Sequence, residues 1–162
     1  MASELGVQTI QHTNGTDALV IGSDGSVLAP NQPLVSVRAE NAGATSGSSV
    51  VPWNIEDIDR GGDFASNVFT APVSGDYMVN AHVLYDNGTA LTSHLVLQKD
   101  TGSGFSSYTD AYTQKSSGEY SGVALVCIVN LNSGDKIRLW NEFGTVYGGG
   151  GNYHSLCIYL LP

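Results

Sequence analysis

Apolar and polar residues alternate along much of the chain, most clearly between Tyr77 and Tyr85. The stretch before it, Val68 to Thr70, is a short apolar run that must stop at Pro72, because proline fixes φ and lacks a backbone N–H. Gly75 follows, and glycine can take the positive φ that a tight corner requires. This pattern predicts a short strand, a corner and a long strand whose side chains point alternately to opposite faces.

The rest of the chain repeats this arrangement of short runs between turn residues. We expect further strands at Leu34 to Glu40, Val50 to Ile55, Ser93 to Lys99, Gly122 to Leu131, Lys136 to Trp140 and Leu156 to Leu161. Glu56 to Asp63 is acidic and is expected to form a loop, whereas Phe105 to Thr113 fits a strand or a loop. No helical periodicity extends beyond about two turns. The pattern predicts an all-β, antiparallel two-sheet sandwich.

Two late strands are apolar on both faces. Ala124, Val126 and Ile128 alternate with five apolar residues of the same strand, and the last strand repeats this property. A sandwich normally exposes polar side chains on its outer faces, so we expect one sheet to be covered by a second copy of the chain or by residues 1–30. The candidate interface residues are Val126, Ile128, Cys157, Tyr159 and Leu161. Which face of these strands is covered is left open by the pattern.

Two motifs carry a resemblance to a known family. The stretch FTAPVSGDY begins at Phe69, and the stretch GVALVCIVNLNSGDKIRLW runs from Gly122 to Trp140. Together they resemble the C1q-like globular domain, a member of the C1q/tumour-necrosis-factor jelly-roll group. The resemblance spans residues 34–162 and implies a jelly roll that assembles as a compact trimer. It implies no ligand site between Trp140 and Gly151, where the sequence departs from the family.

Residues 1–30 differ from the remainder. The segment LGVQTIQHTNGTDALVIGSDGSV contains short alternating runs that cannot bury a core alone. It resembles N-terminal stretches of structural proteins from tailed bacteriophages, which implies an attachment or stem segment. We expect residues 1–30 to form it and residues 31–162 to form the jelly roll; an ordinary flanking hairpin is the alternative. The attachment candidates are Val7, Ile10, Leu19 and Ile21.

Charge and composition exclude several classes of function. The 162 residues carry a formal net charge of −9, which disfavours nucleic acid as a partner. No run approaches the roughly 20 apolar residues of a membrane span, so membrane insertion is not expected. The N-terminal residues lack the basic head and apolar middle of a secretory signal. Cys127 and Cys157 lie in apolar runs and are expected to be free thiols.

The residues that could carry chemistry form no recognised site. The histidines His12, His82, His94 and His154 lack metal-ligand spacing, and no nucleophile elbow or phosphate loop is present. Gly148 to Gly151 is expected to be a mobile loop. Three acidic residues could supply oxygen ligands for calcium, but their spacing matches no calcium loop, and a solvated loop is expected; these are Asp57, Asp59 and Asp63. We therefore expect neither an enzyme nor a cofactor.

Tyrosines in polar or glycine-rich surroundings are the candidate contact residues. Tyrosine combines an apolar ring with a polar tip and suits contacts with protein or sugar. The turns at 86–88, 114–119 and 144–154 should cluster at one end of the sandwich, away from the N-terminal segment. Packing at subunit seams is the alternative role. The residues are Tyr112, Tyr120, Tyr147 and Tyr153.

These observations lead to a functional hypothesis with alternatives. We expect a homotrimeric bacteriophage virion protein, made in the host cytoplasm and located on the virion surface as a capsid decoration or cement protein. The first alternative is a tail-fibre tip or receptor-binding protein that contacts a host-surface glycan or protein. The second is a secreted C1q-like recognition module, against which the missing signal and collagen-like repeat count. Capsid or tail proteins are the expected virion partners.

Overall fold

The computed structural model describes residues 6–162 except His12, Asn14, Thr16 and Pro30. Two compact units divide the chain, Met1–Gln32 and Pro33–Pro162. The first contains a three-stranded sheet of β1 (Thr9–Gln11), β2 (Asp17–Ile21) and β3 (Val27–Leu28). Within it, Val7 and Ile10 are exposed, whereas Leu19 and Ile21 are half-buried. The attachment role of these four residues stays a prediction.

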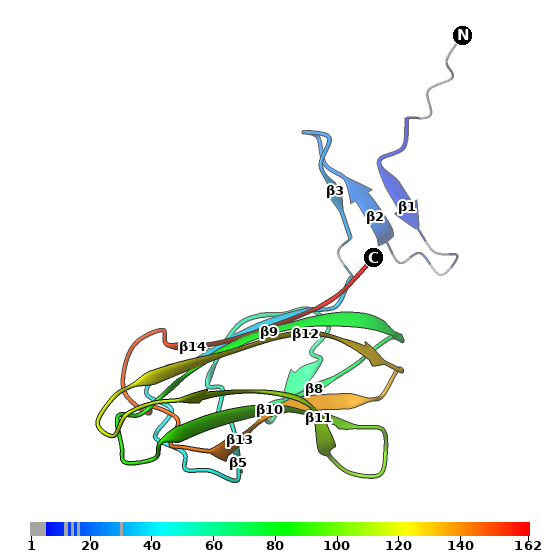
Figure 1. Ribbon diagram of the computed structural model, residues 1–162. Helices are drawn as coiled ribbons and strands as arrows, with labels where there is room; N and C mark the ends of the chain where they lie inside the picture. The colour runs from blue at the N-terminus through cyan, green and yellow to red at the C-terminus, as the bar shows by residue number, and fades with distance from the viewer. Residues whose placement is uncertain (1–5, 12, 14, 16, 30) are drawn as a thin grey trace. The chain divides into compact units, whose positions relative to one another are not determined.

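The second unit is an antiparallel sandwich of two sheets, drawn one above the other in Figure 1. Sheet I has the order β12 (Ser121–Leu131), β9 (Gly75–Tyr85), β14 (His154–Leu160), β4 (Leu34–Ala39) and β6 (Ile55–Asp59). Sheet II has the order β11 (Ser106–Gln114), β10 (Thr92–Asp100), β13 (Lys136–Phe143), β8 (Val68–Thr70) and β7 (Phe64–Ala65), and β5 (Ser49–Val50) also pairs with β13. The all-β jelly-roll prediction is therefore confirmed.

Alternate side chains of both sheets fill the space between them. On β9, the inward residues Tyr77, Val79, Ala81 and Val83 are fully buried, as the period of two requires. Sheet II contributes Leu95 and Leu97 from β10, and Ile137 and Leu139 from β13. Phe69 of β8 contacts the ring of Tyr77 edge-on, with 5.4 Å between the ring centres.

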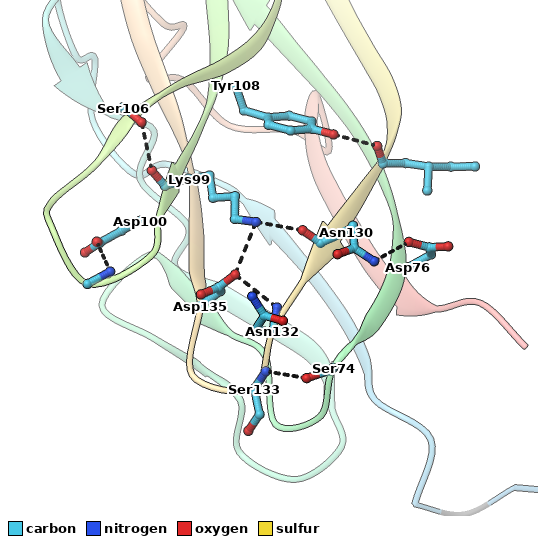
Figure 2. Close-up of polar contacts among 12 residues, drawn as sticks. Ser74, Asp76, Lys99, Asp100, Ser106, Tyr108, Asn130, Asn132, Ser133 and Asp135 are labelled. Carbon is cyan, nitrogen blue, oxygen red and sulfur yellow. Dashed lines mark hydrogen bonds and ion pairs between the residues drawn. The ribbon is translucent and has the colours of Figure 1, made fainter.

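The two motifs behind the family resemblance meet at one end of the sandwich. Ala71 N–H donates to the Asp135 carbonyl at 2.9 Å, and Gly134 N–H donates to the Ala71 carbonyl at 2.8 Å. Ser133 N–H donates to Ser74 Oγ at 3.0 Å, which Figure 2 shows. Gly134 has φ of +92°, a conformation that favours glycine. The motif residues therefore close two neighbouring turns against each other.

A half-buried ion pair reinforces this end. Lys99 Nζ lies 3.1 Å from Asp135 Oδ2 and donates to the Asn130 carbonyl at 2.7 Å (Figure 2). Asp135 also accepts from Asn132 N–H at 3.0 Å. The pKa of Asp135 is lowered, mainly by this backbone hydrogen bond and further by Lys99. Desolvation acts in the opposite direction but does not outweigh them. The L-x-x-G-D pattern is thus a turn closed by its own aspartate.

Some local predictions were wrong. The stretch from Val50 to Ile55 is not one strand, since β5 ends at Val50 and β6 begins at Ile55. The acidic stretch expected to be a loop contains β6, which pairs with β4 at the edge of sheet I through a register shift beside Val37. Its Asp57 accepts from Arg38 Nε at 2.8 Å, which accommodates acidic residues on an edge strand.

Gly75 does not have a positive φ, although the sequence suggested one; a Cβ there would lie 2.6 Å from Leu160 Cδ1. Gly75 therefore packs against the end of the Leu160 side chain, in a backbone conformation that other residues also adopt.

Candidate functional site

The outer face of sheet I carries a contiguous set of apolar side chains. The strand register places Val126, Asn80 and Cys157 in one row across β12, β9 and β14. The next row contains Ile128, Met78 and Tyr159, followed by Leu34 of β4. Val126 is 63% exposed and Ile128 is 52% exposed. The structure thereby shows which face of the late strands is uncovered within this unit.

The predicted interface residues fall on this face with one qualification. Val126, Ile128 and Tyr159 are exposed and Cys157 is half-buried, whereas Leu161 follows the end of β14 and donates its N–H to the Asp76 carbonyl at 2.8 Å. Met78 and Leu34 also lie on this face but were not among the predicted interface residues. The sequence pattern could have identified both, because each is an apolar residue at an outward position of its strand.

The middle of the outer face of sheet II, around Val96 and Arg138, is covered by its own side chains. Val96 is 3% exposed although it points away from the core. The Arg138 guanidinium lies 3.9 Å from the centre of the Phe105 ring and 5.0 Å from that of the Trp140 ring. Trp140 Nε1–H donates to Glu142 at 2.8 Å. The contiguous apolar surface is therefore a property of sheet I.

The two cysteines are free thiols, as predicted. Cys127 is on β12 and Cys157 on β14, and β9 lies between these strands. Cys127 pairs with Val79, whose side chain is in the core, whereas Cys157 pairs with Asn80 on the outer face. Burial raises the pKa of both thiols. Residues on different faces of separated strands cannot form a disulfide.

The three loops predicted to cluster do meet within the second unit. Asp86 N–H donates to the Thr145 carbonyl at 2.8 Å, and Gly118 N–H donates to the Gly88 carbonyl at 3.5 Å. Lys115 Nζ donates to the carbonyls of Asp86 and Glu119. The strand directions place this loop end opposite the end at which Leu34 begins β4. The clustering is confirmed, and the role of these loops in recognition stays a prediction.

Three of the four candidate tyrosines come together at the loop end. Tyr147 is central, with edge-on contacts to Tyr120 at 5.5 Å and to Tyr153 at 5.8 Å between ring centres. With Leu84, these rings line an open pocket of about 390 Å³. Tyr112 does not join them: its ring contacts His94, which stacks on Phe143 at the edge of sheet II. The candidate site is therefore a group of three tyrosines beside the outer face of sheet I.

The glycine run between Tyr147 and Tyr153 is closely packed, although a mobile loop was predicted. A Cβ on Gly148 would lie 2.1 Å from Ala44 N, and a Cβ on Gly149 would lie 2.3 Å from the Tyr147 hydroxyl. Gly151 has φ of +122°, and a Cβ there would lie 2.4 Å from the Tyr153 ring. The absence of side chains lets both tyrosine rings lie against the backbone.

Replacing Gly148 by alanine tests this close packing. We expect Gly148→Ala to lower the free energy of unfolding by about 1–3 kcal/mol, because the methyl group overlaps the backbone of Ala44. Urea denaturation followed by circular dichroism measures the change. Gly88→Ala is the matched control, since no atom lies within 4 Å of its Cβ position. Equal stability of both variants would contradict the packed arrangement.

The acidic residues considered for calcium are used within the fold. Asp57 pairs with Arg38, and Asp59 accepts from the N–H groups of Asp63 at 2.9 Å and Phe64 at 3.1 Å. Burial, and then the charge of Asp59, raise the pKa of Asp63. Among the described residues, no three His, Cys, Asp or Glu side chains are arranged to hold a metal ion. His12 lies outside the described residues. Within the described part of the chain, no helix is long and apolar enough to cross a membrane.

His82 and His154 acquire a structural role that their positions in the sequence did not indicate. His82 Nδ1 lies 3.0 Å from the Tyr153 carbonyl oxygen, and His154 Nε2 lies 2.8 Å from the Tyr147 carbonyl oxygen. Both imidazoles therefore bind the main chain that carries the tyrosines. The loop approaches them only through tertiary packing, so the sequence pattern contained no signal for this contact.

No protein-family model and no curated protein matches the chain. Solved structures do match it. The globular domain of zebrafish complement 1qA has a TM-score of 0.64 at 21% identity, with 81% of this chain and 98% of that chain covered. The Eiger TNF of S. frugiperda has a TM-score of 0.68 at 11% identity, with 82% and 94% covered. Murine APRIL at pH 5.0 has a TM-score of 0.62 at 16% identity, with 80% and 99% covered. The chain therefore has the C1q/TNF-like jelly-roll fold.

Proposed function

We propose that the chain is the subunit of a homotrimer whose interface includes the outer face of sheet I. The exposed apolar rows centred on Val126 and Ile128 carry this proposal. Each large apolar side chain removed from water contributes about 1.5–3 kcal/mol, so the uncovered face favours association. The middle of sheet II needs no such cover, because Arg138 already shields the rings of Phe105 and Trp140 there. The resemblance to C1q-like domains supports three copies.

We further propose that this trimer is a surface protein of a bacteriophage virion, with capsid decoration as its role. The support is the resemblance of the N-terminal segment to attachment segments of phage structural proteins. Val7 and Ile10, 39% and 48% exposed, offer apolar contacts to a capsid protein. The short strands of the first unit also favour stabilisation by an external partner.

Receptor binding at a tail-fibre tip is the second candidate. The exposed rings of Tyr120 and Tyr153 favour it, since they flank the pocket at the loop end of the sandwich. Amphipathic tyrosine rings are common in interfaces with proteins and are suited to sugar contacts. A secreted recognition module is the third candidate, supported by the fold alone.

Immuno-electron microscopy of purified virions separates these functions. Antibody label distributed over the whole head would support decoration and reject the fibre role, whereas label confined to the tail would do the reverse. Absence of label from virions would reject both phage roles. Light scattering coupled to size exclusion tests the trimer separately, and a mass of one chain would overturn it.

Recognition through the tyrosines has its own expected result. If the loop end binds a host surface, the double variant Tyr120→Ala/Tyr153→Ala should lose at least about tenfold in cell-binding affinity, because aromatic anchors dominate interface energies. Flow cytometry with labelled protein on the host bacterium measures it. Tyr108→Ala is the matched control, an exposed tyrosine whose hydroxyl contacts the Ile128 carbonyl of β12. Unchanged binding of the double variant would reject this role.

A further inference from the structure

His154 connects three separate parts of the second unit. It is the first residue of β14 and is 2% exposed. Its Nδ1 accepts from the Leu84 N–H of β9 at 3.2 Å, and its Nε2 lies 2.8 Å from the Tyr147 carbonyl oxygen. A backbone N–H can only donate, so Nδ1 carries no proton. A carbonyl can only accept, so Nε2 does carry one. The two contacts together require the neutral imidazole with its proton on Nε2.

His82 binds the other end of the same loop. Its Nδ1 lies 3.0 Å from the Tyr153 carbonyl oxygen, which makes Nδ1 the donor. The glycine run Gly148–Gly151 is therefore held at both ends by imidazole groups, at Tyr147 and at Tyr153. The same two tyrosines line the pocket at the loop end.

We propose that His154 and His82 form an acid-sensitive latch on the glycine loop, so that protonation of His154 breaks its contact with Leu84 and shifts the imidazolium, together with the Tyr147 carbonyl that it still binds, away from β9, which opens the tyrosine pocket. Adding a proton to Nδ1 of His154 places an N–H against the N–H of Leu84. The hydrogen bond that joins β9 to β14 at this point then becomes a repulsion. A buried donor left without an acceptor is strongly unfavourable. The loop must move for the imidazolium to find water.

The surroundings of His154 favour its neutral form. Burial is the largest cause that lowers its pKa below the ordinary value of 6.5, and the positive charge that His82 can carry lowers it further. The hydrogen bond to Tyr147 acts in the opposite direction. On β4, Arg38 and Glu40 flank Ala39, the residue paired with His154, and form an ion pair at 3.8 Å. Tyr85 follows Leu84 on β9, and Tyr147 and Tyr153 flank the glycine loop that His154 and His82 bind.

The direction of the pH dependence follows from this lowered pKa. The closed loop is fully stabilised above pH 6.5, where His154 is neutral in both the closed and the open form. As the pH falls below 6.5, the open form takes up the proton first, and the closed form is progressively destabilised. The opening equilibrium gains about tenfold for each unit by which the pKa differs between the two forms. Acid therefore destabilises the loop end of the sandwich, where His154 is buried.

Nuclear magnetic resonance of the full chain, labelled with carbon-13 in the histidine and tyrosine rings and in the valine and leucine methyl groups, tests the latch. We expect His154 to be the Nε2–H tautomer at pH 7.5. Between pH 6.5 and 4.5, the ring signals of Tyr147 should lose the shifts caused by its two aromatic neighbours while His154 titrates. Core methyl signals of Val79 and Leu97 should stay unchanged. Titration of His154 without a change at Tyr147, or a pKa of 6.5 or more, would overturn the proposal.

The variant His154→Gln supplies an independent test. A glutamine amide offers an acceptor and a donor in place of the neutral imidazole but does not titrate in this range. We expect it to abolish the pH response of Tyr147. His94→Gln is the control, because His94 pairs with Asp110 at 3.0 Å on sheet II and should leave the response intact. An acid response of Tyr147 that persists in folded His154→Gln would reject the latch, and if this variant fails to fold, the wild-type titration still decides.

Discussion

Ile128→Asp is expected to convert the trimer into a monomer. The side chain is 52% exposed in the single subunit, so the fold tolerates the carboxylate. In the proposed trimer, the same position would be covered by apolar neighbours, and an ionised group buried without a partner costs several kcal/mol. Because the threefold arrangement repeats the cost in each subunit, the dissociation constant should rise by more than about a thousandfold. Sedimentation velocity over a concentration series measures the change.

Leu91→Asp provides the control for this experiment. Leu91 is 58% exposed and precedes β10 of sheet II, so the substitution adds the same charge to a similar apolar site away from sheet I. It should remain trimeric. Dissociation of both variants would indicate a general effect of charge, and persistence of the Ile128→Asp trimer would show that sheet I is not the interface.

Phe69→Ala is expected to cause the largest loss of stability in the sandwich. Phe69 is fully buried, belongs to the short strand β8 and contacts the Tyr77 ring across the core. Removing the ring takes away its burial and leaves a cavity between the two sheets, at a cost of about 3–5 kcal/mol. Urea denaturation at pH 7.5 measures the free energy of unfolding.

Phe143→Ala separates the burial of Phe69 from a general effect of removing a phenylalanine. Phe143 is 56% exposed and stacks on His94 at the surface of sheet II. Its truncation should cost less than about 1 kcal/mol, as is usual for surface substitutions. Similar losses in the two variants would mean that Phe69 is not central to the core.

The strands with a regular period of two were predictable because their pattern reflects burial on one face. This holds for β9 and β10, whereas β12 and β14 were predictable as long apolar runs between turn residues; the inward residues of all four form part of the core. The strand β6 was missed because an edge strand can carry acidic residues on exposed positions, and its pairing with β4 contains a register shift. Local sequence could not reveal the ion pair of Asp57 with Arg38, whose partner lies on another strand.

Glycines and histidines were predicted less well, for a common reason. Gly148 is required by its contact with the backbone of Ala44, and Gly75 packs against the side chain of Leu160; both partners are distant in the sequence. His154 likewise binds Leu84 and Tyr147, which reach it from another strand and from a loop. A rule based on neighbouring residues accounts for turns such as that at Gly134 but not for close approach between distant segments.

The sequence by itself determined the fold class and the presence of an apolar surplus on the late strands, because both follow from the alternation of side chains along a strand. The tertiary structure decided that this surplus lies uncovered on sheet I, that three tyrosines share one pocket, and that two histidines hold the loop between them. These features depend on strand order and register. Residues far apart in the chain become neighbours only after the sheets have paired and packed.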